Sequence, residues 1–328
     1  MKKALVIGSN CFSASNFVDY ALAQGYEVFG TSRSVEAAPH YLPYKINNRE
    51  GFTFLKADLN TELDKIISLC EKHKPGIIVN FAAQGMVAES WQYPLDYYRT
   101  NALGHIALHE KVRQFDFLEK YVHISTPEVY GSTSGVIKED APYNPSTPYA
   151  ASKAACDMSL RTFYQNYDFP VCSTRAANVY GRCQALYRII PKTILSILKK
   201  TRLPLHGGGH SVRAFIHMTD VSAATLAIAE NGKAGSIYHI STDRFISIRD
   251  LVKMICEILS ISFEDAVDIT DDRPGKDAAY TLDSTKVRTE LGWEAKISLE
   301  QGIDECIKWV KDNFDVLKTE PDFYQHKK

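Results

Sequence analysis

The stretch that decides the fold is ALVIGSNCFSASNFVDYALAQGYEVFGTS, residues 4–32. It opens with ALVIG, a short apolar run of the kind found in strands that are buried on both faces. Apolar residues at helical spacing follow over 13–26, and EVFGTS (27–32) has the pattern of a second strand. A strand, a helix and a strand in this order predict a parallel unit of an α/β sheet.

The same alternation continues along the chain. Further strands are predicted at 52–59, 77–84, 121–125 and 170–181, with helices near 61–73, 94–115 and 147–167. This order predicts an α/β fold, a Rossmann-type doubly wound parallel sheet with a smaller C-terminal α/β substrate-binding region. We expect the dinucleotide-binding domain to cover 1–178, with a returning segment near 212–242. The substrate-binding region should then occupy mainly 179–328, with helices near 191–200, 248–260 and 299–314.

Composition excludes several classes of protein. The 328 residues are 45% hydrophobic and 23% charged, with a net charge of −1, so neither nucleic acid nor an anionic membrane is an expected partner. The seven cysteines are scattered without zinc spacing, which predicts reduced thiols in the cytoplasm and no metal site. The apolar part of the first ten residues is too short for a signal peptide, and no run is long enough to span a membrane.

The turn after the first strand is an incomplete nucleotide-binding fingerprint. A helix N-terminus binds a pyrophosphate, and glycines let the backbone approach it. At the usual spacing only Gly8 is kept, and Cys11 replaces the middle glycine, so its side chain would crowd the phosphates unless the loop shifts. The pattern alone fits an ordinary α/β turn equally well. The candidate cofactor residues are Gly8, Asn10, Cys11, Phe12, Ser32, Arg33, Asp58, Leu59, Ala82 and Ala83.

The end of the second strand bears on the choice of dinucleotide. An acidic residue there would bind the ribose 2′-hydroxyl of NAD. The chain instead has Ser32 and Arg33, which favour the 2′-phosphate of NADP over NAD, although Arg33 can equally be a solvated loop cation. Asp58 and Leu59 end the third strand where an adenine would lie. The small Ala82 ends the fourth strand and leaves room for a flat ligand.

Two later motifs, ISTPEVYG (124–131) and PYAASKAA (148–155), carry the chemistry. Tyr149 and Lys153 are four residues apart on one helix and therefore neighbours. A tyrosine ionises near pH 10, and a lysine ammonium together with a nicotinamide cation favours the phenolate. A shift of roughly 3 units, about 4 kcal/mol, would make Tyr149 a general base for an alcohol at neutral pH. Both residues would also contact the cofactor.

These motifs resemble the extended short-chain dehydrogenase/reductases, specifically the nucleotide-sugar 4,6-dehydratases such as dTDP-glucose 4,6-dehydratase and GDP-mannose 4,6-dehydratase. The resemblance covers nearly the whole chain, and further stretches that carry it are NFAAQ (80–84), YYRTNALGH (97–105), RAANVYG (175–181), GGGHSVRAFIHMTDV (207–221) and DDRPGKDAAYTLDSTKVRTELGW (271–293). It implies a homodimer formed through the helices at 94–115 and 147–167, and an NDP-hexose as substrate.

The resemblance also implies a mechanism. An NDP-hexose would become an NDP-4-keto-6-deoxyhexose by oxidation at C4, elimination of water across C5 and C6, and return of hydride to C6. Tyr149 would deprotonate the 4-hydroxyl, Thr126 would hydrogen-bond O4, and Lys153 would hold the nicotinamide ribose. Glu128 would remove the C5 proton. A 4-epimerase needs no such base, and Thr126 and Glu128 could point to the same side of an extended segment.

Pro127 departs from the family pattern. The dTDP-glucose enzymes have aspartate at this position, proposed to protonate the departing O6, and the GDP-mannose enzymes have serine. Either Glu128 handles both protons, a water delivers one, or the reaction differs. A decarboxylase on the same fold also has a Thr-x-Glu pattern, but typically with arginine just after the lysine, where this chain has Ala154. A non-catalytic dinucleotide-binding protein is the rival of a different class.

The second half supplies the candidate substrate contacts. The resemblance places Asn178, Arg213 and Arg273 at the diphosphate and nucleoside, where a guanidinium binds phosphate oxygens in pairs. Each arginine alone fits a surface ion pair as well. Other candidates for the substrate are Gln84, Ser90, Arg182 and Arg188. Nothing in the sequence distinguishes the base of the nucleotide.

Overall fold

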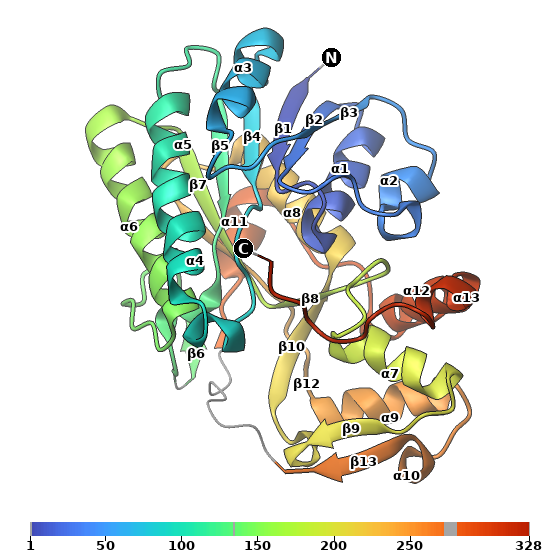
Figure 1. Cartoon of the computed structure of the whole chain (residues 1–328). Coiled ribbons are helices and arrows are strands. Elements are labelled where there is room, and N and C mark those ends of the chain that lie inside the picture. Colours follow the sequence, from blue (N-terminus) through green and yellow to red (C-terminus); the bar gives the residue numbers. More distant parts are fainter. Residues whose placement is uncertain (1, 134, 272–280, 328) are drawn as a thin grey trace.

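A seven-stranded, fully parallel sheet forms the centre of the molecule (Figure 1). The computed structural model describes residues 2–133, 135–271 and 281–327. The strand order is β11-β7-β5-β4-β1-β2-β3, so the chain leaves β1 toward one edge and later returns to build the other. In such sheets ligands bind at the carboxyl ends of the strands where this reversal occurs. The strands are β1 (Lys3–Ile7), β2 (Glu27–Ser32), β3 (Phe52–Lys56), β4 (Ile77–Asn80), β5 (Lys120–Ile124), β7 (Val171–Ala176) and β11 (Ile237–Ile240).

Helices cover both faces of this sheet, and each face has its own buried core. On one face α1, α8 and α11 pack over the sheet, with Phe17, Ile216 and Tyr238 in the core. On the other face α3, α5 and α6 enclose Leu108 and Leu160. The helices of these two layers are α1 (Phe12–Ala23), α2 (Pro43–Ile46), α3 (Leu63–His73), α4 (Pro94–Tyr98), α5 (His105–Val112), α6 (Pro148–Tyr167), α8 (Met218–Asn231) and α11 (Thr285–Leu291).

The second region lies below the carboxyl ends of the strands in Figure 1 and contains small sheets and further helices. Strands β8, β10 and β12 form one sheet there, and β9 pairs with β13. Strand β6 pairs with β14 outside this region, next to α6 (Figure 1). Helices α7, α9 and α12 share a separate apolar core. The bounds are β6 (Val136–Ile137), β8 (Asn178–Tyr180), β9 (Leu203–His206), β10 (Val212–His217), β12 (Phe245–Ser247), β13 (Val267–Thr270), β14 (Thr281–Leu282), α7 (Ile189–Leu198), α9 (Ile248–Ile258), α10 (Phe263–Ala266), α12 (Leu299–Asp312) and α13 (Phe314–Leu317).

Two predicted elements differ from the structure. The strand predicted at 170–181 is two strands, because the chain leaves the main sheet after Ala177, whose N–H still donates to Ile240 O (2.9 Å). The second part, β8, pairs with β10 instead. The helix predicted at 94–115 is interrupted by a π-helical turn, Arg99–Gly104, between α4 and α5. Among the described residues, every helix is too short or too polar to cross a lipid bilayer.

After α13 the chain turns back across the molecule. Figure 1 shows this last, red segment running from α13 past the carboxyl ends of the central strands toward α4. It has no helix or strand of its own, yet several of its side chains are half-buried. We refer to residues 321–327 as the closing segment.

Candidate active site

A large cavity opens at the carboxyl ends of the central strands, between the main sheet and the second region. Its volume is ≈ 1120 Å³. Of the residues predicted from the sequence, those that line it are Gly8, Asn10, Cys11, Phe12, Ser32, Arg33, Asp58, Leu59, Ala82, Ala83, Gln84, Thr126, Tyr149, Asn178, Arg188 and Arg213. The structure thus brings together residues from both halves of the chain.

Gly8 is the one glycine of the fingerprint that the packing requires. Its φ is +84°, and a Cβ at this position would come within 2.7 Å of the Ala82 backbone nitrogen. The N–H groups of Gly8 and Ser9 donate to Thr31 O at 2.7 and 3.0 Å, which holds the turn against the end of β2. A left-handed conformation in such a close contact favours glycine over every other residue.

Cys11 has a capping role that the sequence prediction did not anticipate. It is the N-cap residue of α1, and its Sγ accepts a hydrogen bond from Ala14 N at 3.4 Å. The side chain is therefore bonded to its own helix, and the predicted crowding does not prevent the turn from forming. Phe12 and Ser13 begin α1 and line the cavity, so the positive end of the helix dipole faces it.

The cavity wall fits the phosphate region of a dinucleotide. Asn10 Oδ1 and Thr31 Oγ1 are buried there without a described hydrogen-bond partner, although the amide of Asn10 donates to Val35 O at 2.7 Å. Buried polar atoms without partners are rare in proteins, and they commonly mark a missing ligand or water. Together with the helix N-terminus, they match the donors and acceptors that a pyrophosphate and its riboses need.

Thr126, Pro127 and Glu128 lie on a short helical turn and not on an extended strand. The 3₁₀ helix Pro127–Tyr130 begins directly after Thr126, whose Oγ1 accepts a hydrogen bond from Glu128 N at 3.2 Å. The prediction that Thr126 and Glu128 lie on one extended segment is therefore wrong. Pro127 occupies the first helical position, where its fixed φ and missing N–H cost nothing, and it lines the cavity. Glu128 is half-buried beside it and does not line the cavity itself.

Tyr149 is protonated at neutral pH in this structure. Burial raises the pKa of Tyr149 to about 12, and the charge of Glu128 acts in the same direction, while a hydrogen bond with Thr126 and the charge of Arg188 act against it. The predicted decrease in the pKa of Tyr149 requires both Lys153 and a nicotinamide cation, and Lys153 alone does not outweigh burial here. Deprotonation of Tyr149 therefore requires further positive charge from a bound ligand.

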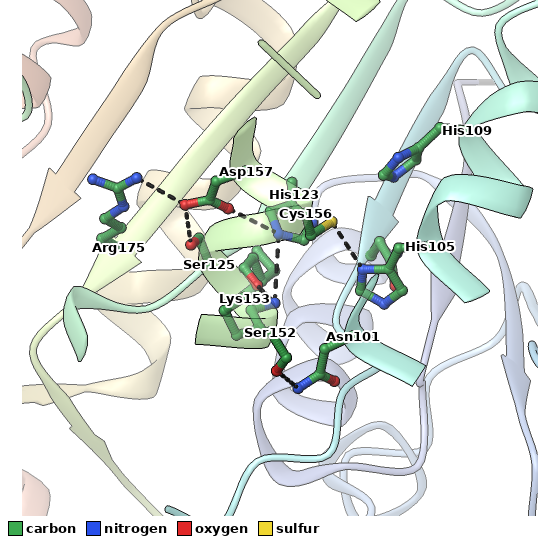
Figure 2. A network of polar contacts seen from close by, with 12 residues as sticks. Asn101, His105, His109, His123, Ser125, Ser152, Lys153, Cys156, Asp157 and Arg175 are labelled. Atoms are coloured by element: carbon green, nitrogen blue, oxygen red, sulfur yellow. Dashed lines mark hydrogen bonds and ion pairs between the residues drawn. The ribbon is translucent and has the colours of Figure 1, made fainter. Parts of the chain in front are cut away.

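Lys153 is turned toward the protein interior (Figure 2). It is 1% exposed, and its ammonium donates to Ile124 O at 2.8 Å and lies 3.4 Å from His123 Nε2. His123 Nε2 in turn lies 3.3 Å from Asp157 Oδ1, and Asp157 Oδ2 accepts from Arg175 Nη2 at 2.7 Å. Lys153 is thus the end of a buried chain of polar and charged side chains, four residues after Tyr149 on α6. It does not line the cavity, because its ammonium is bonded to these interior groups.

The charges of this chain are fixed by burial and by each other. Burial, together with the Lys153 ammonium, lowers the pKa of His123 to about 4, so this histidine is neutral. Burial would raise the pKa of Asp157, but the contact with His123 and the Arg175 guanidinium outweigh it and hold the pKa low. His123, His105 and Cys156 place their ligand atoms within 4.8 Å of one another. The adjacent ammonium of Lys153 disfavours a metal cation there.

Asn101 fixes the position of the residues around it. It lies in the π-helical turn, and its Nδ2 donates to Gln84 O (3.0 Å) and to Ser152 Oγ (3.0 Å), while its Oδ1 accepts from Gln84 N (2.8 Å). These bonds tie the end of β4 to α6, the helix that carries Tyr149. Single π-helical turns of this kind are frequent at functional sites.

Only some of the predicted substrate residues lie at the cavity. Asn178, Arg188 and Arg213 line the cavity on the side of the second region. Arg182 does not, because its guanidinium pairs with Glu305 Oε1 at 3.1 Å. Ser90 is fully buried and donates to Val87 O at 2.6 Å, so it is not available to a ligand. Arg273 lies outside the described residues.

Three tyrosines that no sequence motif predicted also line this cavity. Tyr41, Tyr187 and Tyr324 all line it, and Tyr324 packs edge-on against Tyr187 with ring centroids 5.5 Å apart. Tyr324 belongs to the closing segment, which carries no motif or hydrophobic periodicity. Only its position in space relates it to the site.

Comparisons with known proteins agree with this arrangement. The family model described as GDP-mannose 4,6 dehydratase matches residues 5–306. A dTDP-glucose 4,6-dehydratase of Haemophilus influenzae is 30% identical over 335 residues, which cover 95% of this chain and 99% of its own. The solved structure of DesIV, a dTDP-glucose 4,6-dehydratase from Streptomyces venezuelae with NAD bound, has a TM-score of 0.86 and 30% identity, and the match covers 95% of this chain and 98% of DesIV.

A solved UDP-glucose 4-epimerase from Thermotoga maritima is also similar, with a TM-score of 0.86 and 27% identity over 95% of this chain and 99% of the epimerase. The fold and the site therefore define an enzyme of the extended short-chain dehydrogenase/reductase type. Within that class, the chain belongs to the GDP-mannose 4,6-dehydratase family of nucleotide-sugar 4,6-dehydratases.

Proposed function

We propose that this protein is an NAD-dependent 4,6-dehydratase that converts an NDP-hexose to an NDP-4-keto-6-deoxyhexose. The observation that carries the proposal is that Glu128 lies close behind two residues of the cavity wall, Thr126 and Tyr149. Thr126 and Tyr149 line the cavity and share a hydrogen bond, and the charge of Glu128 acts on Tyr149. A 4-epimerase needs the first two groups, but only an elimination across C5 and C6 needs the carboxylate.

When bound, the dinucleotide accepts a hydride from C4 of the sugar and returns it to C6. Tyr149 takes the proton of the 4-hydroxyl, and Thr126 orients that oxygen, because its own Oγ1 is fixed by Glu128 N at 3.2 Å. The charge of Asp157 acts against loss of the Lys153 proton, and the Lys153 ammonium, four residues after Tyr149 on α6, favours the phenolate. Glu128 takes the C5 proton after the 4-ketone has made it acidic.

Glu128 also delivers the proton to the departing O6 in this proposal. Pro127 has no acidic hydrogen, and it occupies the position that would otherwise carry a donor. Glu128 lies on the same turn as Pro127. As a carboxylate it takes the C5 proton, and it then gives that proton to the departing O6, which leaves as water on the same face of the sugar. This assignment supports a syn elimination.

The nucleotide part of the substrate occupies the side of the cavity formed by the second region. Asn178, Arg188 and Arg213 lie there, and the two guanidinium groups suit a diphosphate.

To test the function, the protein is incubated with GDP-, dTDP-, UDP- and CDP-hexoses and with an NDP-glucuronate, and the products are analysed by mass spectrometry. Loss of water is expected. Loss of CO₂ would indicate a decarboxylase, an unchanged mass with an inverted C4 would indicate an epimerase, and no turnover with no bound cofactor would contradict any enzymatic role.

The working dinucleotide in this proposal is NAD. Arg33 lines the cavity where the NADP prediction needs it, but its Nη2 already donates to Lys327 O at 3.1 Å. The similar DesIV structure contains NAD. We expect calorimetric titration to give a dissociation constant for NAD at least about tenfold lower than for NADP, equivalent to about 1.4 kcal/mol. Tighter binding of NADP would restore the NADP preference inferred from the sequence.

We also propose a homodimer through the outer surfaces of α4, the π-helical turn and α6. Large apolar side chains are exposed there: Leu95 is 74% exposed, Leu103 67% and Met158 54%. Apolar side chains grouped in this way favour a protein interface. We expect Leu103→Glu to produce monomers at concentrations where the wild type is dimeric, measured by sedimentation velocity. The matched control is Ile269→Glu on β13, an equally exposed position, and monomeric wild-type protein would contradict the proposal.

The cysteines support a reducing compartment such as the cytoplasm. All seven are free thiols, and six of them are buried. Free cysteines in this number are typical of proteins that never meet an oxidising environment.

A further inference from the structure

We propose that the closing segment, residues 321–327, is part of the dinucleotide-binding site and retains the bound cofactor. No motif assigns a function to this stretch. Five of its residues line the cavity: Pro321, Phe323, Tyr324, Gln325 and Lys327. The inference rests on the proposed function only in the identity of the ligand, a nicotinamide dinucleotide.

The segment crosses the cavity over the middle of the expected dinucleotide path. Lys327 O accepts hydrogen bonds from Gln84 Nε2 (2.8 Å) and from Arg33 Nη2 (3.1 Å). Arg33 follows β2 and Gln84 follows β4, on opposite sides of β1 in the sheet. The carbonyl of Lys327 therefore bridges the turn after β1, where a pyrophosphate would lie.

His326 fastens the segment to the main domain. Its ring is stacked on Tyr93, with centroids 4.2 Å apart and an interplanar angle of 2°, and its Nε2 lies 3.0 Å from Asp96 Oδ2. The side chain is only 9% exposed. His326 also stacks at 6.2 Å on Tyr97, whose ring meets Tyr149 edge-on, so this contact lies next to the catalytic tyrosine.

The other end of the segment is held by the second region and by the loop after β2. Glu320 immediately precedes the segment. Its Oε2 accepts a hydrogen bond from the Tyr41 hydroxyl, and its Oε1 lies 3.1 Å from His40 Nε2. Lys192 on α7 donates to Asp322 O at 3.4 Å. The segment is thus fixed on both sides of the cavity.

The segment encloses the cavity and does not fill it. The volume of ≈ 1120 Å³ is present with the segment in place, and it already exceeds the roughly 300–1,000 Å³ of ordinary ligand pockets. A covered cofactor also suits the proposed reaction, in which the dinucleotide returns to its starting state in each turnover and need not leave. The segment should therefore slow dissociation of the dinucleotide more than it slows binding.

The test compares the full chain with a chain that ends at Glu320 and so keeps the contacts to His40 and Tyr41. Each protein is loaded with NAD, and dissociation of NAD is followed after rapid removal of free nucleotide. We expect the shortened chain to release NAD about tenfold faster, because it loses the stacking of His326 on Tyr93, the contact of His326 with Asp96 and three further hydrogen bonds. Equal retention by two folded proteins would overturn the proposal, and so would tighter binding by the shortened chain, which would show that the segment blocks the site.

Two point variants keep the test decisive if the shortened chain fails to fold. His326→Ala should speed NAD release severalfold. His326→Phe should restore part of the retention, because a phenylalanine ring can still stack on Tyr93. The matched control is His210→Ala on the second region, which should release NAD at the wild-type rate. An unchanged release rate in His326→Ala would overturn the proposal. The two proposals fail separately, because NAD release is measured without sugar: faster release without dehydration contradicts only the proposed function, and dehydration with unchanged release contradicts only this inference.

Discussion

Glu128→Gln is expected to oxidise C4 of the sugar and to stop there. The variant should lose water elimination by about a thousandfold, because a positioned general base contributes on the order of 10²–10⁴. Oxidation should persist, since the negative charge of Glu128 raises the pKa of Tyr149 and its removal does not hinder Tyr149 as a base. Reduced nicotinamide should therefore accumulate, which is visible as a stable absorbance after substrate is added.

The control for this variant is Glu257→Gln, a matched change at an exposed position on α9, which should eliminate water at the wild-type rate. Normal elimination by Glu128→Gln would show that another group removes the C5 proton. Loss of oxidation together with elimination would instead indicate that the Glu128 carboxylate also positions Tyr149.

A second large effect is expected from acid. Four histidines are fully buried, and burial lowers the pKa of His105 and His109 and brings those of His123 and His239 to about 4. In the unfolded chain a histidine titrates near 6.5. As the pH falls, these histidines therefore bind protons in the unfolded state before they do so in the folded state. The free energy of unfolding is highest above about pH 6.5 and decreases as the pH falls toward 4.

The size of this effect follows from the pKa of about 4 of His123 and of His239. At pH 5, His123 and His239 each cost about 2 kcal/mol of unfolding free energy relative to pH 8, at about 1.36 kcal/mol per unit. We expect urea unfolding to show a loss of at least about 4 kcal/mol between pH 8 and pH 5. His239→Gln should reduce that loss by about 2 kcal/mol, whereas His210→Gln at an exposed position should not change it. A flat stability profile down to pH 5 would contradict the buried neutral histidines.

The central sheet was predictable because its strands are short apolar runs with buried side chains on both faces. The predicted strands at 4–8 and 27–32 correspond to β1 and β2, whereas only the first half of the predicted strand at 77–84 forms β4. What the sequence did not reveal is the sheet to which a strand belongs. Strand β8 has the same local pattern as β7, and only the turn of the backbone at Ala177 places it with β10. The π-helical turn around Asn101 adds one residue to a single turn, which hydrophobic spacing does not resolve.

The site was predictable where a motif fixes its residues within a few positions. Thr126 lies at the cavity because it follows the end of β5, and Tyr149 because it lies at the start of α6. Arg182 and Lys153 were less predictable, since their side chains turn to Glu305 and to Ile124 instead of the cavity. The closing segment reaches the site only through contacts across the whole chain, such as that of His326 with Asp96.

The most direct test of the proposed dehydration is to follow the hydrogen at C4. An NDP-hexose labelled with deuterium at C4 is converted by the protein, and the position of the label in the product is determined by NMR and mass spectrometry. The proposed reaction predicts a product that has lost water and carries deuterium at C6. Deuterium that returns to C4 of a sugar with unchanged mass would contradict it and would identify an epimerase.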